Sequence, residues 1–323
     1  MITEAPEAAL REAVLEEALT GLTSAPKTLS PWLFYDERGS QLFEAITALP
    51  EYYLTRTERA IFAKHGPSLP LRQGSPVTIV ELGAGSASKT GILLQHFADH
   101  QGGVLYQPID ISPTALDEAA ASISAKVPGV VVESQVANYI TDGYSITRLE
   151  RHRVLALYIG SSIGNFSPAE AVGILSNLRD HLEAGDSLLL GVDLAPGKNK
   201  PVETLIAAYD DDAGVTAAFN KNVLVRLNRE LNANFNVDGF AHRARWNAAA
   251  SRMEMHLESL ATQTVTIAGE RIHFREGETI HTENSHKFTE ASILALLEDS
   301  GFRLDRLLHD DQQRFAVVLA DAV

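Results

Sequence analysis

The chain has 323 residues, with 27 Lys and Arg against 42 Asp and Glu, so its formal charge is −15. This acidity argues against a nucleic-acid backbone as the main ligand, because phosphate binding needs clustered positive charge. A hydrophobic fraction of 45% indicates a folded globular protein, and the length allows about two domains. With no cysteine, the chain has no disulfide, thiolate metal site or cysteine nucleophile. The acidic first residues lack an apolar run, so we expect no signal peptide, no membrane association and a cytoplasmic location.

The N-terminal part is expected to hold helices and an aromatic segment. Residues 5–22 have apolar side chains at helical spacing, and Ser-Ala-Pro-Lys at 24–27 breaks the pattern. Aromatic residues then gather in 31–40 and 50–57, on either side of a helical stretch at 41–49. Aromatic side chains near turn residues indicate a binding wall or a lid.

The middle of the chain alternates strands with helices. Repeated βα units with apolar strands predict a parallel sheet covered by helices, with ligands bound at the carboxyl ends of the strands. We expect strands at 77–82, 104–109, 130–133, 154–159 and 187–192, and helices at 88–98, 113–126 and 168–182.

The alternation of strands and helices ends after residue 193. We expect a linker at 195–201 and a helical stretch over 202–231 that is interrupted near 210–212, where Asp210, Asp211 and Asp212 cap or break the helix. Antiparallel strands are predicted at 241–248, 252–260 and 262–274, then a helix at 289–300 and strands at 303–309 and 314–320.

The sharpest local motif is the strand that runs directly into Gly83-Ala-Gly85 and a helix. Glycine allows the tight turn and close approach of the backbone to a ligand. A dinucleotide fingerprint needs a third glycine at position 88, where this chain has Ser88. Glu81 before two glycines is instead typical of S-adenosylmethionine methyltransferases. The alternative interpretation is that the glycines only serve the turn.

Two later strand ends extend the motif. Asp110 ends the next strand, where an acidic side chain accepts hydrogen bonds from both ribose hydroxyls of a nucleoside. Asn138 and Tyr139 follow the third strand and are expected to face the adenine, although the pair alone is also compatible with an ordinary loop. Asn165 follows the fourth strand, where an amide can bind a carboxylate and an amine. Its alternative is a loop residue or a cap for the helix that Pro168 begins.

Six separate segments together resemble the histidine Nα-methyltransferases of ergothioneine biosynthesis. They occur in the family's order over nearly the whole chain, which makes coincidence an unsatisfactory explanation. The segments are residues 34–40, 49–58, 160–165, 208–220, 253–257 and 282–288.

The resemblance implies a fold, domains and an activity. The fold is α/β, a class I S-adenosylmethionine methyltransferase with a Rossmann-like, mainly parallel sheet and a second, α+β substrate-binding domain. The methyltransferase domain would comprise 58–196 and 287–323, and the substrate domain 1–57 and 197–286. Members trimethylate the α-amine of L-histidine, through its mono- and dimethyl forms, to hercynine with three molecules of S-adenosylmethionine. We expect a monomer with a small-molecule substrate.

The resemblance also assigns roles to individual residues. Tyr52 and Asn165 would lie at the methyl-transfer centre, and Asn165 with Tyr209 would bind the amino acid's carboxylate. Glu283 and Ser285 would bind the imidazole. The pocket would be lined by Tyr35 and Met255, and the cofactor held by Tyr52, Gly83, Lys89, Asp110, Asn138 and Tyr139. The family often has Asp-Phe where this chain has Asn138-Tyr139, but an Asn carbonyl still accepts from the adenine amine.

The residue types suit this chemistry. A sulfonium is a strong methyl donor, so the enzyme has to align a neutral amine and exclude water, without a metal. A wall of tyrosines suits the cationic product. Glu283 pairs with a ring N–H, and Ser285, two residues on in an extended segment, points the same way.

Without the resemblance, each residue has a plainer explanation. Met255 would be core, Tyr35 and Tyr52 packing residues, and Lys89 and Glu283 solvated charges. The pair His96 and His100, or the set His281, Glu283 and His286, does not complete a metal-ligand pattern. Two other functions stay open: methylation of another amine such as an indole amino acid, and a cofactor-binding module without catalysis.

Overall fold

The computed structural model describes residues 4–69, 75–85, 87, 89–140 and 143–323. The chain divides into two compact units. Unit 1 comprises Met1–Tyr53 and Pro201–Ser285, and unit 2 comprises Leu54–Lys200 and His286–Val323. The domain boundaries expected from the sequence fall after residues 57, 196 and 286. Ser86 and Ser88 of the glycine-rich segment lie outside the described residues.

Unit 2 is built on one sheet with the strand order β4-β3-β2-β6-β7-β14-β13, with β5 also paired to β3. The strands are parallel except β14, which runs antiparallel to its neighbours β7 and β13. This order is that of a class I methyltransferase, so the predicted fold class is confirmed. The strands are β2 (Val77–Leu82), β3 (Val104–Asp110), β4 (Val130–Val132), β5 (Gln135–Val136), β6 (Arg153–Tyr158), β7 (Ser187–Asp193), β13 (Phe302–His309) and β14 (Phe315–Ala322).

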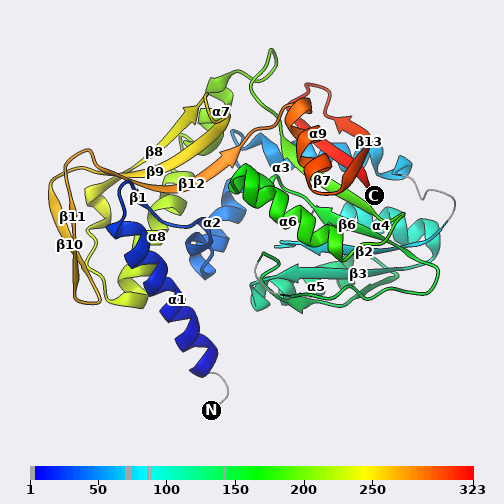
Figure 1. Cartoon of the computed structure of the whole chain (residues 1–323), viewed down its shortest axis with the longest axis horizontal. Coiled ribbons are helices and arrows are strands. Elements are labelled where there is room, and N and C mark those ends of the chain that lie inside the picture. The colour runs from blue at the N-terminus through cyan, green and yellow to red at the C-terminus, as the bar shows by residue number, and fades with distance from the viewer. Residues whose placement is uncertain (1–3, 70–74, 86, 88, 141–142) are drawn as a thin grey trace. The chain divides into compact units, whose positions relative to one another are not determined.

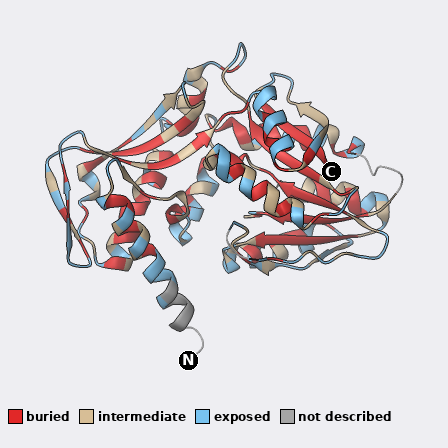
Figure 2. Cartoon of the chain, in the orientation of Figure 1, coloured by how far each residue is buried: buried red, intermediate tan, exposed pale blue. Residues whose placement is uncertain are grey.

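Helices cover the strands of unit 2, and the central strands are buried along most of their length (Figures 1 and 2). Helices α6 and α9 contact each other and share one apolar core with the sheet. Sequence signals set their ends: Ser167 and Glu170 form a capping box before α6, and Pro168 takes its first position. The helices are α3 (Tyr53–His65), α4 (Thr90–Gln101), α5 (Pro113–Lys126), α6 (Pro168–Asp180) and α9 (Glu290–Asp299).

In its described residues, unit 1 combines a four-stranded sheet, a hairpin and the α-helices α1, α2, α7 and α8. The sheet has the order β1-β12-β9-β8, and β10 pairs with β11. Helix α8 contacts α2, β8 and β9. The elements are α1 (Glu4–Thr23), β1 (Lys27–Thr28), α2 (Glu37–Thr47), α7 (Val202–Tyr209), α8 (Val215–Leu231), β8 (Phe240–Asn247), β9 (Arg252–Ser259), β10 (Gln263–Ile267), β11 (Glu270–Phe274) and β12 (Thr279–His286).

The single strand expected at 262–274 is wrong, and the predicted elements do not include α3, β12 or the short strands β1 and β5. Residues 262–274 form two strands, because Ala268 and Gly269 both have positive φ (49° and 92°) and make a two-residue hairpin turn. The expected linker at 195–201 contains the point where the chain passes from unit 2 to unit 1, and its Lys200 is 1% exposed. Helix α3 begins within the aromatic segment at 50–57, for which no helix was predicted. The expected interruption of the 202–231 helix is confirmed, since Asp211 accepts the Val215 and Thr216 N–H groups at the start of α8.

A buried cluster of charged side chains lies at the end of β7 in unit 2. Asp193 is 0% exposed, and its two carboxylate oxygens lie 2.7 Å from Lys200 Nζ and 2.9 Å from Lys287 Nζ. Lys200 is the last residue before the chain enters unit 1, and Lys287 lies just after it returns. One carboxylate therefore fixes the chain at both of these crossings.

None of the helices in the described residues is both long and apolar enough to cross a membrane.

Candidate active site

The glycine turn of unit 2 has the conformation that its sequence predicts. Gly83 and Gly85 have φ of +68° and +51°, a region that other residues rarely adopt. The Gly83 N–H donates to the Ile109 carbonyl at 2.8 Å, so the turn is fixed to the end of β3. A Cβ on Gly83 would lie 3.1 Å from the Tyr139 hydroxyl. The structure therefore brings Tyr139 against the turn.

Asp110 connects this turn to the next helix. One carboxylate oxygen accepts the Gly85 N–H at 3.1 Å, and the other accepts the Ser112 N–H at 3.0 Å. The Asn138 carbonyl oxygen accepts the Ile140 N–H at 3.1 Å, which orients the amide within its own loop. Gly83, Asp110 and Tyr139 are thus held together at the carboxyl ends of neighbouring strands, with Asn138 next to Tyr139 in the chain.

Lys89 is held by a residue that sequence reasoning did not find. Its ammonium lies 2.5 Å from a carboxylate oxygen of Glu58, which is fully buried in the middle of α3. Glu58 also accepts the Gly160 N–H at 2.9 Å. The plainer explanation of Lys89 as a solvated charge is therefore wrong. Its predicted role in cofactor binding stays a prediction.

Glu81, the second-to-last residue of β2, is a buried carboxyl group. It accepts hydrogen bonds from Thr90 at 2.9 Å and from the Tyr106 hydroxyl. Burial raises the pKa of Glu81 to about 7, against the lowering effect of these two hydroxyl groups. The hydrogen bonds of Glu81 therefore connect β2 to β3 and α4 within the protein.

Asn165 ends a short 3₁₀ helix, Ser162–Asn165, that follows β6. Gly164 packs against the backbone of His286, since a Cβ at position 164 would lie 2.8 Å from the His286 carbonyl oxygen. This contact fixes the loop before the half-buried Asn165 next to the last residue of β12. Glu283 and Ser285 lie on that same strand, immediately before His286.

An aromatic row crosses unit 1. Tyr35 meets Phe43 edge to face with 5.8 Å between ring centres, Phe43 meets Tyr52 at 6.4 Å, and Tyr52 meets Tyr209 at 6.4 Å. The Tyr209 hydroxyl donates to the Ser285 hydroxyl at 2.7 Å. The structure therefore links four of the predicted substrate or catalytic residues, Tyr35, Tyr52, Tyr209 and Ser285, through one residue, Phe43, that sequence reasoning did not single out.

Glu283 and Ser285 are buried side chains of β12, with 9% and 4% of their surface exposed. The plainer explanation of Glu283 as a surface carboxylate is therefore wrong. Met255 is 2% exposed on β9, and its carbonyl accepts a hydrogen bond from Thr282 at 3.0 Å. The burial of Met255 agrees with the core explanation, and its predicted place in the imidazole pocket stays a prediction.

A buried polar network supports this region from behind. The His242 Nε2 atom lies 2.7 Å from the Tyr209 carbonyl, so this nitrogen carries the proton and Nδ1 accepts from the Asn220 amide at 2.8 Å. Asn220 in turn accepts from Thr282 at 2.8 Å. Burial lowers the pKa of His242, which keeps the ring neutral. Asn220 and Thr282 belong to the segments that carried the family resemblance, which was their only signal.

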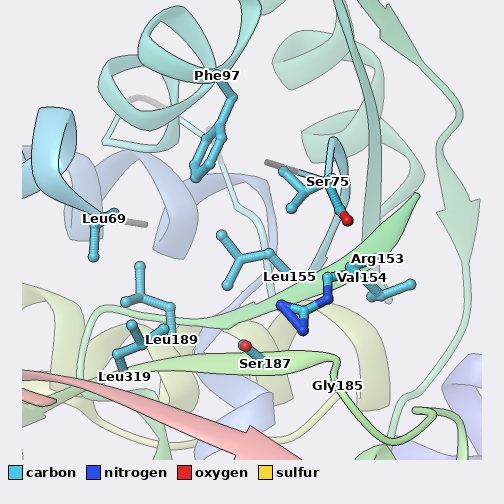
Figure 3. Close-up of a pocket in the computed structure, with 11 residues that line it drawn as sticks. Leu69, Ser75, Phe97, Arg153, Val154, Leu155, Gly185, Ser187, Leu189 and Leu319 are labelled. Carbon is cyan, nitrogen blue, oxygen red and sulfur yellow. The ribbon is translucent and has the colours of Figure 1, made fainter. Parts of the chain in front are cut away.

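A small pocket in unit 2 lies away from these residues (Figure 3). Val77, Arg153 and Ser187 line it, and they begin β2, β6 and β7. The glycine turn, Asp110 and Asn165 follow the opposite, carboxyl ends of the strands. Since ligands of such sheets bind at the carboxyl ends, we do not assign this pocket to the active site.

Comparison with known proteins identifies the family. The model of a family described as histidine-specific, S-adenosylmethionine-dependent methyltransferase matches residues 14–322. The chain belongs to this family. A histidine N-alpha-methyltransferase of Mycolicibacterium smegmatis is 40% identical, with 96% of this chain and 95% of the relative covered. The enzyme of the same name from Mycobacterium tuberculosis is 38% identical, with 95% and 94% covered. Ergothioneine biosynthesis protein 1 of Neurospora crassa is 32% identical over 66% of this chain and 24% of that protein.

The protein is therefore an S-adenosylmethionine-dependent N-methyltransferase, and its residues fit that cofactor. The side-chain-free positions 83 and 85 leave the backbone accessible at the turn, and nothing lies within 4 Å of a Cβ placed on Gly85. Asp110 stands at the end of the adjacent strand, where a ribose would meet its carboxylate. When bound, the cofactor supplies an activated methyl group.

Proposed function

We propose that this protein methylates the α-amine of L-histidine three times to give hercynine, the first step of ergothioneine biosynthesis. The observation that carries the substrate assignment is the buried carboxylate of Glu283 beside the Tyr209–Ser285 hydrogen bond in unit 1. A buried carboxylate pairs with an imidazole N–H, and a hydroxyl bonds the second ring nitrogen. An indole offers one donor and no acceptor, so this pair of groups favours histidine.

The proposed binding roles fall on residues of both units. Gly83, Lys89, Asp110, Asn138 and Tyr139 of unit 2 hold the cofactor, and Asn165 binds the carboxylate and the amine of the amino acid. In unit 1, Glu283 and Ser285 hold the imidazole, and Tyr209 binds the carboxylate. Tyr35 and Met255 line the imidazole pocket, and Tyr52 lies at the methyl-transfer centre.

The chemistry needs a lone pair on the amine. In each of the first two transfers the amine loses a proton and gains a methyl group, and the third transfer converts a tertiary amine into a fixed cation. A neighbouring sulfonium lowers the amine pKa, because like charges disfavour protonation. Tyr52 and Tyr209 present aromatic rings, which stabilise quaternary ammonium groups.

Replacement of Glu283 tests the assignment. Glu283→Ala removes a charged hydrogen-bond partner worth about 1.5–3 kcal/mol, so KM for histidine should rise about 10- to 150-fold. The variant should also discriminate less against tryptophan and phenylalanine, because the site loses the group that rejects rings without a second nitrogen. Product masses after incubation with labelled cofactor and each of the 20 amino acids measure both effects.

The matched control is Glu276→Ala, which removes an exposed carboxylate from the same unit. It should leave histidine turnover unchanged. Unchanged histidine turnover in Glu283→Ala would refute the role of Glu283. Turnover of a different amino acid by the unmodified protein, with none of histidine, would refute the proposed function itself.

A further inference from the structure

Three metal-binding side chains meet on the sheet of unit 1. Glu254 and His256 are two residues apart on β9, so they point to the same face, and His281 comes from the adjacent strand β12. Their ligand atoms all lie within 4.8 Å of one another. The His256 and His281 rings stack with 4.7 Å between centres, and His256 Nε2 lies 3.1 Å from a Glu254 oxygen.

The hydrogen bonds around the cluster leave ligand atoms for a metal. Asn247 and Arg252 both bond the same Glu254 oxygen, Oε1, at 2.9 and 2.8 Å, so Oε2 faces His256 alone among the described residues. His256 is 8% exposed, and Nε2 is its ring nitrogen next to Glu254 Oε2. Its Nδ1 atom points away from this carboxylate and is buried without a hydrogen-bond partner among the described residues. The Glu283 carbonyl lies 3.1 Å from His281 Nε2, an outer contact of the kind that orients metal-binding histidines.

We propose that Glu254, His256 and His281 form a binding site for a divalent transition-metal ion of the zinc class, which links β9 to β12. Two imidazoles and one carboxylate are a donor set for zinc and its neighbours, and they leave a fourth position for water. Magnesium and calcium prefer oxygen ligands, so this set disfavours them. The charged groups that act on the imidazoles are Glu254, Arg245 and Arg252, and the two arginines oppose the metal's charge.

The site has a consequence for the strand that carries the proposed imidazole-binding residues. His281 is two residues before Glu283 and four before Ser285 on β12. A metal ion would therefore fix this strand to β9 and stabilise unit 1, without taking part in methyl transfer. The proposal is independent of the histidine assignment.

The test uses the untagged full-length protein after removal of metals with EDTA. Titration calorimetry with zinc chloride should give one equivalent of zinc bound, and zinc should raise the thermal unfolding temperature. Cobalt(II) serves as a coloured probe, since its visible absorption reports coordination by nitrogen and oxygen. Loss of an outer contact already costs about 10- to 100-fold in metal affinity, so His256→Ala and His281→Ala should each weaken zinc binding at least about tenfold.

The matched control is His273→Ala, which removes an exposed imidazole from β11 and should bind zinc as the unmodified protein does. Glu254→Gln provides a second variant that keeps the side-chain shape, and far-UV circular dichroism checks that each variant is folded. Zinc binding by His256→Ala and His281→Ala that equals the unmodified protein's would overturn the proposal, as would the absence of bound zinc. Histidine methylation, measured in parallel after EDTA treatment, reports on the proposed function separately.

Discussion

Replacement of Asp193 by asparagine should destabilise unit 2 strongly. The carboxylate lies between two buried ammonium groups, at 2.7 Å from Lys200 and 2.9 Å from Lys287, with no more than 1% of any of the three side chains exposed. Asparagine keeps the size of the side chain but removes its charge. Two ammonium groups would then share a site with one amide, whose NH₂ group can accept from neither.

The magnitude follows from the burial. Removal of one partner from a buried ion pair costs about 3–5 kcal/mol, because it leaves an uncompensated charge. Burial lowers the pKa of Lys200 to about 8 even with the carboxylate present. Without the carboxylate, Lys200 loses its proton more easily, so we expect a loss near the lower end, about 3 kcal/mol, at pH 7. The loss should be smaller at pH 9, where Lys200 is neutral.

Urea unfolding followed by far-UV circular dichroism measures this loss. With an m value of about 3 kcal/mol/M, the midpoint should fall by about 1 M. Asp311→Asn is the matched control, since Asp311 pairs with Lys64 at the surface with 86% of its side chain exposed, and its midpoint should not move. The replacement of Asp193, Lys200 and Lys287 together by Leu, Met and Met should recover most of the loss. Equal midpoints for Asp193→Asn and Asp311→Asn would refute the reasoning.

Two further predictions concern Glu81 and Asp110, which lie next to the glycine turn. Burial raises the pKa of Glu81 from 4.5 to about 7, so the folded state binds more protons than the unfolded state between these pH values. The stability that Glu81 contributes through this proton is complete below about pH 4.5 and is lost as the pH rises through 7. Between pH 5 and 8, the unmodified protein should therefore lose about 2–3 kcal/mol of unfolding free energy that Glu81→Gln does not lose. Urea unfolding at both pH values measures this, and an equal change in unfolding free energy for the two proteins would contradict it. Asp110→Asn should weaken S-adenosylhomocysteine binding about tenfold or more, as measured by calorimetry. The control Asp117→Asn, which changes an exposed residue of α5, should leave the affinity unchanged. Equal affinities of the two variants for S-adenosylhomocysteine would exclude the ribose contact of Asp110.

The parts of the fold that depend on local signals could be predicted from the sequence. Residues 77–82 and 113–126 were expected as a strand and a helix and have these bounds in β2 and α5. A glycine pair after an apolar strand, and Ser112 with Pro113 at a helix start, act within a few residues. The Ala268-Gly269 turn was equally local, but an alternating pattern on both sides concealed it.

The parts that depend on distant residues could not be predicted. Glu58 meets Gly160 across 102 positions of the chain, and no feature of either residue specifies the other. His256 and His281 come together only through the pairing of β9 with β12, so a search for histidines at close spacing found other sets. The substrate-binding roles of Tyr209 and Ser285 were predicted through the family resemblance, because their residue types alone indicate packing or loops.

The order in which the chain leaves the ribosome has a consequence for unit 1. Its first 53 residues are separated from their partners, residues 201–285, by the 147 residues from 54 to 200. At about 5–20 residues per second, roughly 7–30 s pass before the synthesis of residues 201–285, which include the helix α8 that α1 and α2 contact, begins. During synthesis, the apolar side chains of Leu22, Leu33 and Phe34, which are buried in the finished protein, are exposed to solvent or to a chaperone. Moving the first 53 residues to the C-terminus by circular permutation would shorten this interval for the nascent chain.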